Sequence, residues 1–425
     1  MKELVVSGGK PLNGRIKCDG AKNAALPILA ATLLTQGVTH LTQIPDLADV
    51  ETMLAILSSV GASTKMSSGQ VRVRAEHLVC DVPYELARMM RASFLVMGPL
   101  LVRCGEAHVP LPGGCAIGRR PVDLHLKGFE AMGAVVSMEQ GNIIAKAPRL
   151  HGADIYLDVP SVGATENIMM AASLAEGVTT IDNAAQEPEI VDLANFLNAA
   201  GAKISGAGTS RIRIKGVKQL HGVEYTIIPD RIEAATYLVA AAATLGNICV
   251  ENVIPAHLTS VLAKLEECGY VVLESDSGVE IISESRPKPV NIKTMPYPGF
   301  PTDVQAPFAS LCSLGLGTSV ISETVFESRF GYVEELERMG ADIRVEGPNA
   351  IVEGVDYLKG ANVHARDLRG GAGLCIAALS ADGISHITGV EHLERGYSDF
   401  CGKLRSLGAE ISYGYDVDQP LRLVK

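Results

Sequence analysis

Hydrophobic positions along the chain alternate between two kinds of predicted helix, and glycines follow both kinds. The first kind is apolar on nearly every side, as in residues 24–31 and 234–241. A helix without a polar face must be buried inside a domain. The second kind is amphipathic, as in residues 333–339, and suits a position between a sheet and solvent. Short β-branched runs follow the helices, so the pattern predicts an α/β fold.

The glycines reveal a repeat of about 70 residues, a period typical of repeated supersecondary units. One set recurs at nearly constant intervals after the amphipathic helices and comprises Gly61, Gly133, Gly201, Gly269, Gly340 and Gly408. A second set ends the apolar helices earlier in each unit and comprises Gly37, Gly105, Gly177, Gly246, Gly317 and Gly383. Glycine readily takes the left-handed conformation that ends a helix. Six units of helix, strand, helix and strand are therefore predicted, arranged either as two globules of three units or as an open solenoid.

The composition is that of a folded, acidic protein with more than one domain. Of its 425 residues, 47% are hydrophobic, and the net charge is −11. This charge disfavours nucleic acid and anionic membranes as partners. Pro27 and Glu233 interrupt the longest apolar runs, so no membrane span is expected. Nine scattered cysteines without a Cys-x-x-Cys pair, and no secretory leader, indicate a cytoplasmic protein.

Charged residues recur where the apolar helices are expected to begin. Fourteen or fifteen residues before the glycines that end these helices stand Lys22, Arg91, Gly163, Arg231, Asp303 and Arg369. A helix start carries a partial positive charge, so an added cation disfavours the helix but strengthens an anion site. Ordinary surface cations are the alternative, and the recurrence favours an anion site. Ser161 and Gly163 offer a capping hydroxyl and room for a phosphate to approach the backbone.

Two residues are candidates for chemistry. Asp303 is a carboxylate at a helix start, and is either a helix cap or a general base toward a substrate hydroxyl. Cys115 lies in a loop rich in glycine and proline, just before Arg119 and Arg120, whose charge would lower the pKa of its thiol. Walker A, His-Glu-x-x-His and dinucleotide motifs are missing, and the ten histidines do not cluster at metal spacing. The sequence therefore predicts no metal and no cofactor.

Ten segments, in order along the chain, resemble the enolpyruvyl transferases, and in particular the branch that uses UDP-N-acetylglucosamine. They are residues 20–27, 90–93, 112–115, 120–125, 161–165, 229–233, 300–303, 323–330, 367–369 and 395–397. The resemblance implies a two-domain inside-out α/β barrel of six repeats, three per domain. One domain would be residues 22–229 with the Cys115 loop, and the other residues 1–21 with 230–425. The active site would lie in the cleft between them.

The resemblance also implies a reaction. The enolpyruvyl group of phosphoenolpyruvate would be transferred to the 3′-hydroxyl of UDP-N-acetylglucosamine through a tetrahedral ketal, with release of phosphate, at the start of peptidoglycan synthesis. Cys115 would donate a proton to the methylene carbon, form a covalent phosphoenolpyruvate adduct and be alkylated by fosfomycin. Asp303 would take the proton of the sugar hydroxyl. The oligomeric state stays open.

Further site residues follow from the resemblance position by position. Lys22, Arg120 and Arg395 would hold the phosphate and carboxylate of phosphoenolpyruvate, with Arg91 and Arg369 nearby. The residues expected to contact the nucleotide sugar or to order the closed site are Asn23, Arg120, Pro121, Val122, Asp123, Leu124, Ser161, Val162, Gly163, Asp303, Val325 and Arg329. Ala48 and Val159 stand where some relatives have lysine, which leaves nucleotide affinity or the closing step in doubt.

Two other functions remain open on the sequence. A sister transferase acts on shikimate 3-phosphate and shares the fold, but it lacks the Pro-Gly-Gly-Cys loop and has a Ser-Lys-Ser type motif where this chain has Ala21, Lys22 and Asn23. A non-catalytic six-repeat binding scaffold is the second alternative. The presence of Lys22, Cys115, Asp303 and Arg395 together argues against it.

Overall fold

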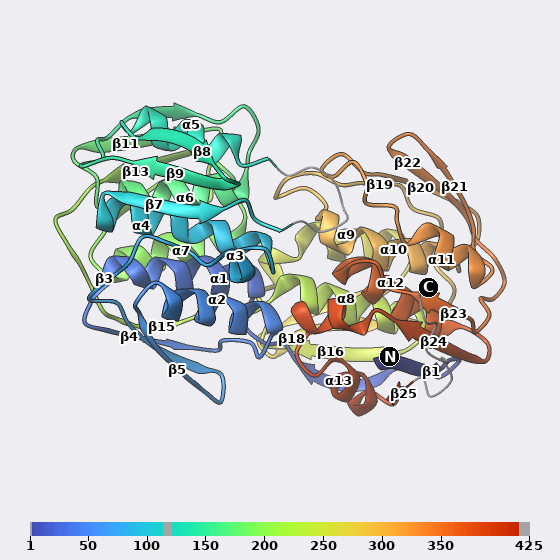
Figure 1. The fold of residues 1–425 in the computed structure, drawn as a ribbon. Helices are drawn as coiled ribbons and strands as arrows, with labels where there is room; N and C mark the ends of the chain where they lie inside the picture. The colour runs from blue at the N-terminus through green and yellow to red at the C-terminus, as the bar shows by residue number, and fades with distance from the viewer. Residues whose placement is uncertain (1, 114–120, 416–425) are drawn as a thin grey trace, which may run out of the picture.

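The computed structural model describes residues 2–113 and 121–415, which form two lobes (Figure 1). Each lobe has its own hydrophobic core. One core uses residues between 21 and 227, and the other combines residues 4–18 with residues 232–411. We call these the inserted lobe and the terminal lobe, because the first is inserted in the sequence of the second.

Three buried helices form the centre of each lobe. They are α1 (Lys22–Ala31), α4 (Met97–Cys104) and α6 (Val162–Ala172) in the inserted lobe, and α8 (Arg231–Ala243), α10 (Gln305–Cys312) and α12 (Leu368–Ser380) in the terminal lobe. A 3-10 turn leads into two of them, η2 (Arg91–Val96) before α4 and η4 (Thr302–Val304) before α10. Each of these six buried segments starts within one residue of the position that the glycine spacing predicts.

Three sheets of three or four strands pack on the buried helices of each lobe, and the labels below follow their spatial order. The inserted lobe also has a two-stranded sheet, formed by β14 (Leu220–His221) and β3 (Thr35–Gln36). In the inserted lobe, the first sheet consists of β15 (Glu224–Thr226), β4 (Val38–Thr42), β6 (Gln70–Arg74) and β5 (Ser63–Ser67). The second consists of β7 (Glu106–Pro110), β9 (Asn142–Lys146) and β8 (Val135–Glu139). The third consists of β10 (Asp154–Tyr156), β11 (Val178–Asp182), β13 (Arg211–Lys215) and β12 (Lys203–Ser205). In the terminal lobe, the first sheet consists of β17 (Val271–Ser275), β18 (Gly278–Ile282), β16 (Asn247–Glu251) and β2 (Asn13–Lys17). The second consists of β19 (Ile292–Lys293), β20 (Thr318–Ser322), β22 (Asn349–Glu353) and β21 (Asp342–Glu346). The third consists of β23 (Asn362–His364), β24 (Ile384–Thr388), β1 (Lys2–Ser7) and β25 (Glu410–Tyr415).

The amphipathic helices lie against these sheets, each in contact with the strand that follows it. They are α2 (Ala48–Ser59), α5 (Asp123–Ala131), α7 (Pro188–Ala199), α9 (Thr259–Glu267), α11 (Val333–Arg338) and α13 (Phe400–Ser406). The smaller elements are η1 (Thr32–Leu34), β3 (Thr35–Gln36), α3 (Tyr84–Ala87), β14 (Leu220–His221), η3 (Pro255–His257) and η5 (Val390–Arg395). Within the described ranges, no helix combines the length and the apolar character that crossing a membrane requires.

The glycines that follow the amphipathic helices behave as predicted, since all six have φ between 91° and 107°. The earlier set does not end the buried helices as predicted, because only Gly105 of the six is a helix C-cap and the other five glycines lie beyond the C-cap residues of their helices. In this set Gly246 and Gly317 also lack positive φ, and Leu245 takes the left-handed conformation just before Gly246. Gly246 is required for a different reason, because an added Cβ would lie 2.0 Å from the carbonyl oxygen of Leu12. Close approach to the backbone just before β2, rather than helix termination, selects glycine there.

Two chain segments join the lobes side by side. Ala21 donates its N–H to the carbonyl of Ile228 (2.7 Å), and Asp230 donates its N–H to the carbonyl of Asp19 (2.9 Å). Gly20 forms a bridge with Pro229 between these bonds. A Cβ at Gly20 would lie 1.8 Å from the carbonyl oxygen of Gln43, so only glycine fits. This double connection holds the start of α1 next to the start of α8.

The contact between α10 and α12 provides a test of the packing. A Cβ at Gly373 would lie 2.9 Å from the carbonyl carbon and oxygen of Ala306. We expect Gly373→Ala to push the two helices apart and to lower the free energy of unfolding by about 1–3 kcal/mol, measured by urea denaturation. Gly331→Ala is the matched control, because no atom lies within 4 Å of its added Cβ. Equal stability of the two variants would contradict this close packing.

Candidate active site

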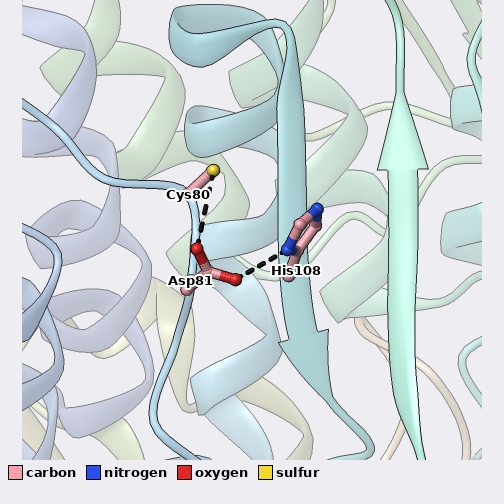
Figure 2. A group of neighbouring side chains, drawn as sticks. All are labelled: Cys80, Asp81 and His108. Carbon is pink, nitrogen blue, oxygen red and sulfur yellow. Dashed lines mark hydrogen bonds and ion pairs between the residues drawn. The ribbon is translucent and has the colours of Figure 1, made fainter. Parts of the chain in front are cut away.

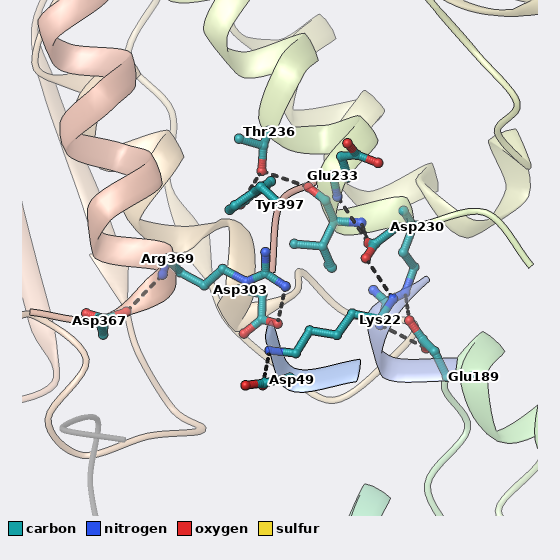
Figure 3. A network of polar contacts seen from close by, with 12 residues as sticks. Lys22, Asp49, Glu189, Asp230, Glu233, Thr236, Asp303, Asp367, Arg369 and Tyr397 are labelled. Atoms are coloured by element: carbon teal, nitrogen blue, oxygen red, sulfur yellow. Dashed lines mark hydrogen bonds and ion pairs between the residues drawn. The ribbon is translucent and has the colours of Figure 1, made fainter. Parts of the chain in front are cut away.

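Positively charged side chains and their counter-ions meet where the two lobes join. Lys22 starts α1 in the inserted lobe, and Arg369 is in the first turn of α12 in the terminal lobe (Figure 3). Arg395 ends η5 in the terminal lobe. Lys22 and Arg369 are buried, with exposed fractions of 8% and 4%. Burial lowers the pKa of the Lys22 ammonium group, Asp49 counteracts this, and the nearby Arg369 and Arg395 lower it further. The site is therefore a concentration of positive charge.

Asp49 is the counter-ion of two of these cations. Its carboxylate lies 2.7 Å from Nζ of Lys22, and accepts hydrogen bonds from Nε (2.9 Å) and Nη2 (3.4 Å) of Arg395. Burial would raise the pKa of Asp49, but Lys22 and Arg395 hold it below its ordinary value. Asp49 lies in the first turn of α2, where the helix dipole also favours a carboxylate. The bond to Arg395 links the two lobes.

Asp303 accepts hydrogen bonds from two buried arginines. Nη2 of Arg329 donates to Oδ1 at 2.7 Å, and Nη2 of Arg369 donates to Oδ2 at 3.4 Å. Burial would raise the pKa of Asp303, but Arg369 and Arg329 hold it well below the ordinary range. Asp303 does not cap its helix, because Pro301 is the N-cap residue of η4. The helix-cap alternative is therefore wrong, and the carboxylate is held ionised in the site.

Arg369 is positioned from several sides. Asp367 caps α12 by accepting the N–H groups of Arg369 and Gly370, both at 3.0 Å. The guanidinium lies over the ring of Tyr397, 5.2 Å from its centroid, and the hydroxyl of Tyr397 is 2.9 Å from that of Thr236 on α8. Nη1 of Arg369 is buried and has no hydrogen-bond partner among the described residues. A buried N–H without an acceptor is costly, and an anionic ligand would supply one.

A second pair of contacts connects the lobes beside the first. Glu189 on α7 accepts from Nε (3.0 Å) and Nη2 (3.3 Å) of Arg231, which starts α8. Asp230 caps α8 by accepting the N–H groups of Ile232 (2.8 Å) and Glu233 (3.1 Å). The same carboxylate accepts the N–H of Lys22 at 3.2 Å. The Asp230 side chain therefore accepts hydrogen bonds from backbone N–H groups at the starts of two helices, one from each lobe.

Two of the remaining predicted positions, Arg91 and Gly163, lie near His125 in the inserted lobe. The Ser161 hydroxyl caps α6 by accepting the N–H of Ala164 at 3.3 Å, as its position suggested. A Cβ at Gly163 would lie 3.2 Å from Cε1 of His125. Burial, with a contribution from Arg91, lowers the pKa of His125 to about 3, so this imidazole is neutral. Nη2 of Arg91 donates to the carbonyl of Pro121 at 3.0 Å.

The structure thus brings together Lys22, Asp303, Arg329, Arg369 and Arg395. Val122 is buried, Leu124, Val162 and Gly163 are half-buried, and Asn23, Pro121, Asp123 and Val325 are exposed. Cys115 and Arg120 lie outside the described residues.

Sequence reasoning gave no role to Asp49, Glu189, Asp230, Tyr397 and His125. The predicted gathering of buried cations was a usable signal for Asp49, since such charges need a nearby carboxylate.

Comparisons with known proteins identify the class of protein. The sequence matches the profile of the EPSP synthase (3-phosphoshikimate 1-carboxyvinyltransferase) family over residues 6–404. The enolpyruvyl transferase NikO from Streptomyces tendae superposes with a TM-score of 0.87 at 25% identity, over 97% of this chain and 98% of that chain. An EPSP synthase from Acinetobacter baumannii has the same fold, with a TM-score of 0.77 at 20% identity, over 98% and 100% of the two chains. The chain is therefore a carboxyvinyl transferase.

Three relatives of high sequence identity show which family of carboxyvinyl transferases the chain belongs to. A protein of Carboxydothermus hydrogenoformans is 58% identical over 97% of this chain and 99% of its own length, and one of Caldanaerobacter subterraneus is 54% identical over 96% and 99%. A third, from Halalkalibacterium halodurans, is 52% identical over 99% and 96%. All three are named UDP-N-acetylglucosamine 1-carboxyvinyltransferase. The chain belongs to the UDP-N-acetylglucosamine 1-carboxyvinyltransferase family.

The role of Asp49 as a counter-ion can be tested with phosphate. Asp49→Asn leaves Lys22 and Arg395 without their shared carboxylate, so we expect it to destabilise the protein by roughly 3 kcal/mol in phosphate-free buffer. Added inorganic phosphate should raise the midpoint of thermal unfolding more for the variant than for the wild type. In the variant, phosphate no longer competes with the Asp49 carboxylate for Lys22 and Arg395. Asp46→Asn, at an exposed position just before α2, is the control. An equal response of Asp49→Asn and wild type to phosphate would argue against this role.

The ionised state of Asp303 predicts a pH dependence. A carboxyl whose pKa is lower in the folded than in the unfolded protein stabilises the fold above its ordinary pKa, 3.8, and loses this effect as the pH falls through the lowered value. The difference in unfolding free energy between wild type and Asp303→Asn should stay constant between about pH 5 and pH 8 and shrink only below about pH 4. Urea denaturation at a series of pH values measures it. A decrease already near neutral pH would show that Asp303 is not held ionised.

Proposed function

We propose that the protein transfers the enolpyruvyl group of phosphoenolpyruvate to the 3′-hydroxyl of UDP-N-acetylglucosamine and releases phosphate, at the start of peptidoglycan precursor synthesis. The observation that carries this proposal is the cluster of buried cations next to an ionised Asp303, in a chain at least 52% identical to three proteins named for this activity. Both proposed substrates are anions, and the cluster offers the charge to bind them.

The cations are assigned to phosphoenolpyruvate. Lys22, Arg369 and Arg395 are held at the join of the lobes, and in the proposal they bind its phosphate and carboxylate with Arg120 and Arg91. Asp49 forms ion pairs with Lys22 and Arg395, and Asp303 forms one with Arg369. An incoming phosphate would replace the carboxylate of Asp49 as the partner of Lys22 and Arg395. The site is thus arranged before the substrate binds, which reduces the cost of gathering like charges.

Asp303 is assigned to the sugar hydroxyl. A carboxylate held by two guanidinium groups is a weak base, and the best general base has a pKa near the working pH. A substrate carboxylate that binds Arg369 would draw that guanidinium away from Asp303, 3.4 Å distant, and so raise the pKa of Asp303. Binding of phosphoenolpyruvate would then prepare the base for the hydroxyl. Nη1 of Arg369, which lacks a partner among the described residues, is available for the same anion.

The proposed reaction has two steps. In the addition, the 3′-oxygen bonds to C2 of phosphoenolpyruvate, its proton passes to Asp303, and C3 gains a proton from Cys115. In the elimination, C3 returns a proton to the Cys115 thiolate, the double bond between C2 and C3 forms again, and the bond from C2 to the phosphate oxygen breaks. Inorganic phosphate then leaves with the proton that Asp303 had taken. Positive charge develops at C2 in both steps, and fixed charges around the phosphate and carboxylate favour it. Water must be excluded, because it would compete with the sugar hydroxyl.

The proposal extends to the nucleotide sugar, the architecture and the location. Ser161, Val162 and Gly163 at the start of α6 are assigned to the nucleotide sugar, with Asn23, Pro121 to Leu124, Val325 and Arg329. We infer two domains, residues 22–229 and residues 1–21 with 230–425, each an inside-out α/β barrel of three repeats. The two separate cores and the three sheets of three or four strands in each lobe support this. The eight cysteines in the described ranges are free, which supports a cytoplasmic enzyme.

A phosphate-release assay with two acceptors tests the function. Phosphoenolpyruvate with UDP-N-acetylglucosamine should release phosphate, and phosphoenolpyruvate with shikimate 3-phosphate should not. Asp303→Asn should lower kcat by about 100- to 10,000-fold, because the hydroxyl loses its base, while calorimetry still detects the nucleotide sugar. Asp342→Asn, at an exposed carboxylate on β21, is the matched control and should retain activity. Release with shikimate 3-phosphate alone, or release with neither acceptor, would overturn the proposal.

A further inference from the structure

A thiol, an imidazole and a carboxylate meet on the inserted lobe, in contacts separate from those of the candidate active site. They belong to Cys80, Asp81 and His108, and one ligand atom from each lies within 4.8 Å of the others (Figure 2). Oδ1 of Asp81 is 2.6 Å from Nδ1 of His108, and Sγ of Cys80 is 3.9 Å from Oδ2 of Asp81. These are three kinds of atom that bind divalent transition metals.

The backbone holds the three side chains together. Asp81 forms a parallel bridge with His108 on β7. The N–H of His108 donates to the carbonyl of Cys80 at 2.7 Å, and the N–H of Val82 donates to the carbonyl of His108 at 3.0 Å. The three residues are therefore held in position by main-chain bonds on both sides of His108. A cavity of about 470 Å³, lined by Cys80, Asp81, Cys104 and Glu106 among others, opens beside them.

Glu106 provides a further carboxylate at the same place. Its Oε2 lies 3.7 Å from Nε2 of His108, and its Oε1 accepts from the Cys80 thiol at 3.6 Å. Nε2 of His108 is buried and has no hydrogen-bond partner within the described parts of the chain. Metal-binding histidines commonly donate their second N–H to a carboxylate, which sets the orientation of the ring. Glu106 is positioned to accept that bond once Nδ1 binds a metal.

We propose that Cys80, Asp81 and His108 form a binding site for a divalent transition-metal ion, with zinc as the expected metal. Sulfur, nitrogen and oxygen ligands in one tetrahedral site are typical of zinc, at separations of about 3.3–3.8 Å between ligand atoms. Sγ of Cys80 and Oδ2 of Asp81 nearly meet this separation, and the Asp81 carboxylate would turn away from Nδ1 to admit the ion. Water would complete the coordination.

Metal binding at this site converts the Cys80 thiol to a thiolate, which is the form that binds metals. The sulfur–proton bond breaks, the proton leaves to solvent, and the sulfur electron pair binds the metal.

The sequence expectation of no metal rested on the spacing of the histidines, which cannot reveal this group. Cys80 and Asp81 are adjacent, whereas His108 comes much later in the sequence, on the neighbouring strand. The next unit has a related bridge between His151 and Glu176, whose side chains lie 3.7 Å apart. The neighbours of His151 in sequence are Leu150 and Gly152 rather than a cysteine. That pair is a built-in control for a histidine–carboxylate contact without the thiol.

Cobalt absorption tests the site directly. The full chain, first treated with chelator and then desalted, is titrated with Co²⁺, and the near-ultraviolet thiolate-to-cobalt charge-transfer band is recorded. One equivalent should give the band, and Zn²⁺ should remove it by displacement. Cys80→Ser should lose the band and His108→Ala should weaken binding at least tenfold. Glu106→Gln should weaken it about 10- to 100-fold, the usual effect of losing the carboxylate behind a metal-bound histidine.

Three variants serve as controls. Cys104→Ser removes a thiol that lines the same cavity, Cys115→Ser removes the reactive cysteine predicted for the active site, and His151→Ala removes the histidine of the related bridge. All three should keep the band and the affinity of the wild type. Circular dichroism of Cys80→Ser checks that its fold is intact. A band that persists in Cys80→Ser, a band lost in Cys115→Ser, or no band in the wild type would overturn the proposal.

Discussion

The structure depends on the balance of charge where the two lobes meet. Lys22, Arg231 and Arg369 lie at helix starts, where the helix dipole opposes a cation, and all three side chains are buried or nearly so. Such an arrangement is tolerated only if carboxylates lie within hydrogen-bond distance. Asp49, Glu189 and Asp303 supply them, and two of the three accept a hydrogen bond from the opposite lobe. The same contacts thus neutralise the site and join the lobes.

The helices and their starts could be predicted from the sequence because their signals are local. Runs of alanine and leucine predict burial, and the glycine after each amphipathic helix has the φ that its helix end requires. The earlier glycine set shows the limit of this reasoning, since only Gly105 of the six is the C-cap of its buried helix. Contact with Leu12, far away in sequence, selected glycine at position 246, and a local pattern carries no information about that contact.

The active site could be predicted only in part, because contacts between residues distant in sequence determine the rest of it. Cations stand at the same position in four of the six units, so Lys22, Arg91 and Arg369 could be found from spacing alone. The carboxylates that pair with them come from elsewhere, and Asp49 and Arg395 are 346 residues apart. Asp303 could be recognised as unusual, but its two arginine partners could not be inferred from its position. The fold determines which charged residues form ion pairs, whereas the regular spacing of the cations is visible in the sequence.

The insertion of one lobe in the sequence of the other has a consequence for synthesis on the ribosome. Strands β1 and β2 are made early, but their sheet partners β16, β24 and β25 are made only after the whole inserted lobe. The core of the inserted lobe is complete in sequence by residue 227, so it has all its residues while β1 and β2 still lack partners. The order of synthesis therefore favours folding of the inserted lobe first, with the first strands added to their sheets last.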